Sequence, residues 1–276
     1  MPFELKSENT VIKKMARWER RLLNALFLAA YALVLVLLWW HLPLPGRPGW
    51  PAAVLLLLAV VSTIAALARH LPLQNILLAA ILIALAGGAA TWLDLKTGIP
   101  FGQFTTDNDM EPKLHKTLPW AIPVIWIVAI LNSRGVARLI LRPWRKMRSY
   151  GFWLIGITAM LTVLFDLALD PFASRVKHYW FWEPTKLPLT WQGAPLVNFF
   201  GWLVVTLLIL AFITPILIKK HPIHRRPPDF HPAGVWIGGV LLFGIGSATM
   251  GLWSAILLDG IICLAVAVFV VRGARW

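Results

Sequence analysis

Long apolar stretches dominate the chain and predict its architecture. Eight of them are long enough to cross a bilayer, and they lie at about residues 22–40, 51–68, 72–93, 118–141, 151–170, 195–218, 233–250 and 252–271. The last two share one apolar run that is too long for a single span, so we divide it near Gly251. The first run follows a charged segment and has no small-residue cleavage site, which indicates a membrane anchor rather than a signal peptide. The pattern predicts an all-α fold, a polytopic membrane helix bundle of about eight transmembrane helices that forms a single integral membrane domain over residues 1–276.

Composition and charge support this class and limit the partners. The 276 residues are 59% hydrophobic and only 14% charged, yet the formal net charge is +14. If the N-terminus lies inside, 19 of the 26 lysines and arginines fall on the inner side and 7 on the outer side. The positive-inside rule therefore explains the basicity without a nucleic acid partner. We expect cytoplasmic N- and C-termini, a basic cytoplasmic segment at residues 1–21, and anionic lipid headgroups at the cytoplasmic face of the cell (inner) membrane.

Two carboxylates at the end of an apolar run are the most informative polar residues. Asp166 and Asp170 stand four residues apart, on one face of the predicted helix, and Pro171 is expected to stop that helix just past them. A charged residue at membrane depth costs about 2.5–3.5 kcal/mol on insertion scales, so a functional role is the default interpretation. Asp94 and Asp259 map to the same outer half of the membrane. The alternative is that Asp166 and Asp259 only hydrogen-bond neighbouring helices.

Two long outer loops, at residues 94–117 and 171–194, are rich in Gly, Pro and aromatic residues. This composition is typical of ordered turns rather than of flexible linkers. Five aromatic residues of the second loop are candidates for a shared role, and they are Tyr179, Trp180, Phe181, Trp182 and Trp191. They are expected either to form an aromatic belt at the membrane interface or to wall a cavity that stabilises a cation. Asn198, just inside the sixth span, lies at a similar level and is a candidate for orienting water or a carboxylate.

Several short motifs, in order along residues 91–202, resemble those of a family. Thr97-Gly98-Ile99-Pro100-Phe101-Gly102 is similar to the TGxPFG loop of the membrane carotenoid-biosynthesis proteins, which include carotenoid 1,2-hydratases and bisanhydrobacterioruberin hydratases. The Asp166–Pro171 segment and Trp180-Phe181-Trp182 resemble the family's next blocks. The segment from Gly193 to Trp202, with Pro195 and Asn198, resembles its GxPxxNFxGW block, and Pro123 and Trp126 resemble residues of an intervening span. Thr91 stands where the family commonly has a glutamate, and Phe104 stands where it has a tyrosine.

The resemblance implies a reaction that suits these residues. The family adds water across the terminal C1=C2 double bond of a long acyclic carotenoid such as lycopene, and this gives a tertiary alcohol. A carboxyl in a low-dielectric site stays protonated near neutral pH and can supply the proton, while an ionised carboxylate accepts one from water. We assign Asp166 as the acid and Asp170 as the base, with exchangeable roles, and Asp94 as the acid that replaces the missing glutamate. The substrate-binding candidates are Thr97, Gly98, Pro100, Phe101, Gly102, Trp180, Trp182, Pro195, Asn198 and Trp202.

The resemblance further implies that the elongated substrate enters laterally from the lipid. No redox cofactor, nucleotide or metal is expected, and association with other carotenoid-pathway enzymes is a further expectation. Cys263 is the only cysteine, which excludes an internal disulfide and a thiolate metal cluster.

Other classes of protein share parts of this pattern. A lycopene-cyclase-like enzyme would begin with the same protonation but trap the cation with an internal alkene, and a non-enzymatic carotenoid-binding protein would need only the apolar groove. A membrane prenyltransferase would need aspartate-rich motifs for Mg²⁺ and diphosphate, which the chain lacks. A di-iron hydroxylase would need clustered histidines. His221, His224 and His231 stand together in one basic loop, where solvation beside lipid is the simpler interpretation.

Overall fold

The computed structural model describes residues 3–40, 50–107, 112–114, 117–184, 189–218 and 227–276. Within these residues, eight helices are long and apolar enough to cross a membrane. They are α1 (Phe3–Trp40), α2 (Trp50–Leu67), α3 (Leu73–Thr97), α4 (Ala121–Ile140), α5 (Tyr150–Pro171), α6 (Leu196–Ile213), α7 (His231–Thr249) and α8 (Trp253–Ala274). The predicted all-α membrane bundle is therefore confirmed, including the division of the last apolar run at Gly251, whose φ of 69° belongs to a left-handed turn.

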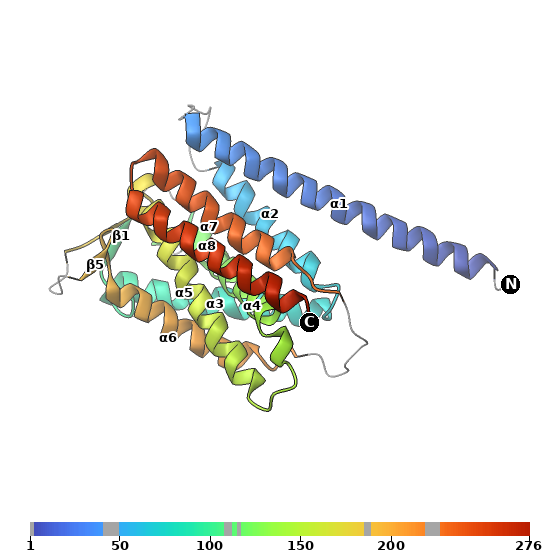
Figure 1. The fold of residues 1–276 in the computed structure, drawn as a ribbon. Coiled ribbons are helices and arrows are strands. Elements are labelled where there is room, and N and C mark those ends of the chain that lie inside the picture. The colour runs from blue at the N-terminus through green and yellow to red at the C-terminus, as the bar shows by residue number, and fades with distance from the viewer. Residues whose placement is uncertain (1–2, 41–49, 108–111, 115–116, 185–188, 219–226) are drawn as a thin grey trace.

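The centre of the bundle is α4, which packs against α2, α3, α5, α7 and α8 and is the most buried of the spans. Small residues allow these helices to approach closely. A side chain on Gly135 would collide with Pro232 of α7, and one on Gly87 of α3 would collide with Trp126 of α4. At the edge of the bundle, α1 packs against α2 and α7, and its N-terminal part extends beyond the ends of its neighbours (Figure 1).

Helix α5 ends at its proline, as predicted, and a π-helical segment follows it directly. Pro171 is its last residue, and the chain continues as a π-helical segment, η2 (Phe172–Val176). A proline has no N–H, so Pro171 leaves the carbonyl oxygen of Leu167, four residues earlier, without its helical donor. The indole Nε1 of Trp191 donates to that oxygen at 3.1 Å. The second outer loop thus supplies the hydrogen bond that the proline cannot make.

Short strands gather at one end of the bundle (Figure 1). They are β1 (Phe104–Thr106), β2 (Lys113–Leu114), β3 (Leu118–Pro119), β4 (Trp180–Trp182), β5 (Thr190–Trp191) and β6 (Ala194–Pro195). Strands β1 and β4 pair antiparallel, with Phe104 opposite Trp182 and Thr106 opposite Trp180. Pairing of β1 with β4 therefore joins the described parts of the two long loops, which are far apart in sequence.

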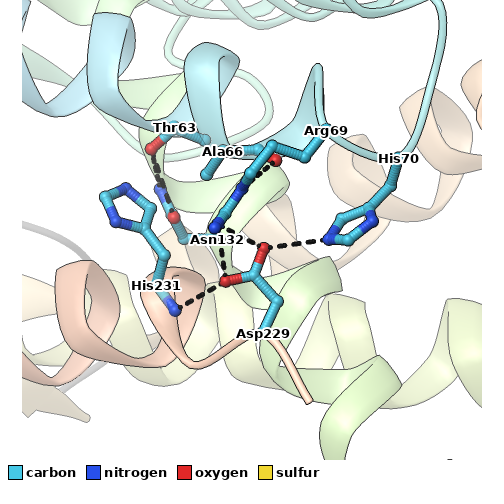
Figure 2. Close-up of polar contacts among 7 residues, drawn as sticks. All are labelled: Thr63, Ala66, Arg69, His70, Asn132, Asp229 and His231. Carbon is cyan, nitrogen blue, oxygen red and sulfur yellow. Dashed lines mark hydrogen bonds and ion pairs between the residues drawn. The ribbon is translucent and has the colours of Figure 1, made fainter. Parts of the chain in front are cut away.

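Polar contacts join the C-terminal half of α2, and the residues just after it, to α4 and to the start of α7 (Figure 2). Asp229 accepts two hydrogen bonds from Arg69 Nη2, at 2.8 and 2.7 Å, and lies 3.3 Å from His70 Nε2. Its Oδ1 also accepts from the backbone N–H of His231, an otherwise unpaired donor in the first turn of α7. Deeper in the bundle, Asn132 of α4 donates to the hydroxyl of Thr63 at 3.0 Å. These contacts fix α2 against α4 and α7.

Candidate active site

The two carboxylates of α5 lie side by side and are almost fully buried. Asp166 is 2% exposed and Asp170 is 1% exposed. The amide nitrogen of Asn198, in the first turn of α6, donates to both of them, at 2.8 Å to Asp166 and 3.1 Å to Asp170. One nitrogen therefore bridges the pair and holds the two carboxyl groups in a fixed relation.

The two carboxylates differ in their other partners. The second oxygen of Asp170 accepts hydrogen bonds from the indole nitrogens of Trp180, at 3.0 Å, and Trp182, at 2.9 Å. Side chains two residues apart on a strand point to the same side, which explains why both indoles of β4 reach one oxygen. Among the described residues, Asn198 is the one side chain that donates to Asp166. Three N–H donors stabilise a negative charge on Asp170, whereas Asp166 is the better location for a shared proton.

A small cavity of about 40 Å³ opens beside the pair. One water molecule needs roughly 10–15 Å³ of cavity volume. The cavity therefore has room for a water beside a small apolar group. Its polar lining comes from Asp166, Asp170, Asn198 and Thr91, and the remainder is apolar. The apolar lining consists of Phe101, Phe104, Ile122, Ile125, Trp126, Leu169, Trp180, Trp182 and Trp202.

Aromatic rings form two walls of this cavity. On one side, Trp126 of α4 stacks on Trp202 of α6, with ring centroids 3.7 Å apart, and Phe101 packs against both. On the other side, Phe104 of β1 packs against Trp182 with centroids 5.1 Å apart. The arrangement places electron-rich rings around a site with a proton donor, which is suited to stabilising a carbocation.

The loop from Thr97 to Gly102 carries Phe101 into the wall. The sequence predicted Asp94 in the loop, but it lies in the last turns of α3. Its carboxylate accepts hydrogen bonds from the backbone N–H groups of Phe101, at 2.6 Å, and Gly102, at 3.2 Å. Gly98 ends α3 with a left-handed φ of 71°. A Cβ on Gly201 of α6 would lie 2.6 Å from the carbonyl oxygen of Pro100, so only glycine lets the loop seat against α6.

The predicted site residues thus divide into two groups. Phe101, Trp180, Trp182, Asn198 and Trp202 line the cavity with the acid pair. The others belong to the supporting loop or its contacts. Thr97 is exposed and bonds to the carbonyl of Leu93, Gly98 and Pro100 shape the loop, and Pro195 lies against Gly102. Among the described residues, Asp94 is not part of the cavity lining. Its carboxylate instead accepts hydrogen bonds from the backbone of the loop.

Sequence reasoning missed part of the wall. Ile122, Ile125 and Leu169 line the cavity but carry no motif, since an apolar residue in an apolar helix gives no signal of its own. Trp126 and Phe104 entered only through the family resemblance. Gly87 of α3 has no side chain, and this leaves room for the indole ring of Trp126 from α4.

Asp259 does not join the acid pair. It is 2% exposed on α8 and lies beside Gly244 of α7, where neither of its oxygens has a hydrogen-bond partner in the described structure. Within the same residues, no group of three or more His, Cys, Asp or Glu side chains could hold a metal ion. His221 and His224 lie outside the described residues, and His231 begins α7.

We expect the replacement of Asp94 to act on stability and loop position. Asp94→Ala removes the acceptor of two backbone N–H groups, and an unsatisfied buried group costs about 1–3 kcal/mol. Asp94→Asn keeps an acceptor oxygen and should lose less. Thermal unfolding of the purified protein in detergent measures both. An Asp94→Asn protein that unfolds like the wild type but has lost all turnover would contradict the positioning role and return Asp94 to the reacting groups.

Comparisons with known proteins identify the family of the chain. The family model described as "Carotenoid biosynthesis protein" matches residues 51–266, which include every element of the cavity. Bisanhydrobacterioruberin hydratase of Haloarcula japonica is 31% identical over 110 residues, which span 40% of this chain and 35% of that protein. No solved structure matches the chain. Because the family model covers most of the sequence, the chain belongs to the carotenoid biosynthesis protein family.

Proposed function

We propose that this protein is a carotenoid hydratase, which adds water to the terminal C1=C2 double bond of an acyclic carotenoid and leaves a tertiary hydroxyl group. The observation that carries the proposal is the buried pair of carboxyl groups with unequal donors, Asp166 and Asp170, inside an aromatic cavity. Proton transfer to an alkene needs an acid, and capture of the cation by water needs a base. The pair supplies both in one place.

In the first step Asp166 acts as the acid. Its carboxyl proton passes to C2 of the terminal double bond, the π electrons form the new C–H bond, and C1 becomes a tertiary cation. Asp166 is left as a carboxylate. The rings of Trp180, Trp182 and Trp202 line the space around the cation, and they stabilise it through their quadrupoles.

In the second step water attacks C1 and Asp170 accepts the proton that water releases. The net change is the addition of one water molecule, with no oxidant, reductant or cofactor. Asn198 donates to both carboxylates, so it keeps their oxygens close enough for the proton to return from Asp170 to Asp166 before the next turnover. Exclusion of bulk water by the apolar walls limits premature proton loss.

The comparisons support this proposal at two levels. Membership of the carotenoid biosynthesis family gives the substrate class. The relative from Haloarcula japonica is named as a hydratase, and the reaction is carried over to this chain as part of the proposal. No element of the reaction requires a metal or nucleotide.

Expression in cells that accumulate lycopene tests the function. Mass analysis of the pigments should show a product that is heavier by one water for each reacted end. A cyclic product of unchanged mass would point to a lycopene-cyclase-like enzyme, which traps the same cation with an internal alkene. Bound but unaltered pigment would point to a carotenoid-binding protein. The absence of hydroxylated product with lycopene and with longer acyclic carotenoids would overturn the hydratase.

We further propose that both termini face the cytoplasm and that the β1–β4 loop structure faces outward, as the positive-inside rule predicts. Single cysteines placed at Thr106 of β1 and at Arg145, after α4, should react with a membrane-impermeant thiol reagent from opposite sides. The protein without either substitution gives the background, since Cys263 is buried. Labelling of both positions from the same side would contradict the eight-span topology.

A further inference from the structure

A second, much larger cavity lies next to the acid cavity. Its volume is about 670 Å³, within the range of roughly 300–1,000 Å³ that is typical of sites for small organic ligands. Residues of α1, α2, α4, α5 and α7 line it, and nearly all of them are apolar. We call it the apolar chamber. Neither the family description nor the relative's name assigns it a role.

The apolar chamber and the acid cavity share a wall. Ile125 of α4, Leu169 of α5 and Trp180 of β4 line both spaces. Trp180 donates its indole N–H to Asp170, so the partition between the two spaces is tied to the acid pair. The same three side chains therefore separate the chamber from the cavity that holds the acids.

The lining of the chamber combines small residues with large aromatic ones. Ala52, Ala59 and Ala121 face it from α2 and α4, and Gly239 faces it from α7, where a Cβ would lie 2.9 Å from the ring of Phe165. The lining also includes flat aromatic side chains such as Phe27 and Trp50. An apolar space with aromatic surfaces fits a flat, elongated hydrocarbon and offers few partners for a polar ligand.

Polar groups occur at the rim of the chamber, beyond the end of α5. Lys177 and Tyr179 line it there. Burial raises the pKa of Tyr179 to about 12 and lowers the pKa of the Lys177 ammonium group. Both changes have the same physical cause, which is the removal of these groups from water. Lys177 and Tyr179 are both half-buried, so these polar groups of the lining are partly removed from water.

We propose that the apolar chamber binds the hydrocarbon body of the acyclic polyene substrate, with the reacting end directed past Ile125, Leu169 and Trp180 into the acid cavity. The proposal deepens the proposed function, on which it rests only for the identity of the polyene. Helix α1 packs against α2 and α7 at the edge of the bundle (Figure 1) and contributes Phe27, Tyr31 and Val34 to the lining. In this proposal the substrate enters from the lipid at that edge.

Filling the chamber tests the proposal by binding rather than by turnover. Asp166→Asn protein, purified from lycopene-accumulating cells, is the reference, because substrate should stay bound when it does not react. Adding Ala52→Phe and Ala121→Phe places two rings into the chamber, and bound lycopene per protein should fall about tenfold, equivalent to 1.4 kcal/mol. The matched control adds Ala84→Phe, a half-buried alanine of α3 that is not in the chamber lining, and should keep its pigment.

The outcomes separate this proposal from the proposed function. Loss of pigment in the filled variant but not in the control supports the chamber, even if the wild type forms no hydroxylated product. Equal pigment in both variants overturns the chamber. Loss of a co-purified phospholipid instead of pigment also overturns it, since a lipid acyl chain would then be the occupant. Thermal unfolding of each variant checks that it is folded. The smaller substitutions Ala52→Leu and Ala121→Leu complete a graded series, in which pigment binding should fall stepwise with the added side-chain volume.

Discussion

Asp166→Asn is expected to reduce the rate of hydration by about a thousandfold, within the range of about 10²–10⁴ that a general acid contributes. The substitution keeps the shape of the side chain and an oxygen that accepts the hydrogen bond from Asn198. It removes the transferable proton. The measurement is the initial rate of hydroxylated carotenoid formation in isolated membranes, normalised to the amount of folded protein.

Asp259→Asn is the matched control for this result. Asp259 is also a buried acid of a membrane helix, with 2% exposure like Asp166, but it lies between α7 and α8, away from the acid cavity. We expect the control to keep the wild-type rate. An Asp166→Asn enzyme with an unchanged rate would remove Asp166 from the mechanism, and equal losses in both variants would indicate a general need for buried acids.

Asp170→Asn is expected to lower the rate by about a hundredfold, the lower end of the range for general base catalysis. An asparagine oxygen still accepts the indole N–H groups of Trp180 and Trp182, so the geometry of the aromatic wall is preserved. The variant cannot take a proton from water. The cation should therefore persist longer, and side products that arise by proton loss back to an alkene should increase relative to the alcohol.

The ratio of products separates the two acids. Asp166→Asn should lower alcohol and rearranged alkene together, because no cation forms. Asp170→Asn should lower the alcohol more than the alkene. If Asp166→Asn were the variant that raised the share of rearranged alkene, the acid and base roles would be the reverse of those proposed. Chromatography of the pigments with mass detection measures both products.

The helices and the acid pair could be predicted from the sequence, and the reason is physical. Runs of apolar residues of bilayer length have few other stable structures, and the spacing of Asp166 and Asp170 places both on one helix face whatever the neighbours are. The end of α5 at Pro171 was also predictable, but the π-helical segment after it was not. Nor does any local pattern indicate that Trp191 donates to the carbonyl of Leu167 from 24 residues away.

The inner details of the site depend on contacts between distant segments. Nothing local indicates that Asn198 bridges two carboxylates more than 25 residues earlier, or that Trp180 and Trp182 donate to the same oxygen. The pairing of β1 with β4, which sets the position of both indoles, joins loops on either side of α4 and α5. The chemical role predicted for Asp94 comes from its place one turn after Thr91, where the family has a glutamate. Its contacts with the N–H groups of Phe101 and Gly102 could not be predicted, because backbone groups carry no side-chain signal.

In the proposed reaction water, and no other reagent, supplies the new oxygen after proton transfer to the alkene. The most direct test is turnover of an acyclic carotenoid by the wild-type protein in water labelled with heavy oxygen and deuterium. The account predicts a product with one labelled oxygen in each new hydroxyl group and one solvent-derived hydrogen on the adjacent carbon. An unlabelled hydroxyl group, which would derive from molecular oxygen, or a product with no added oxygen, would contradict it.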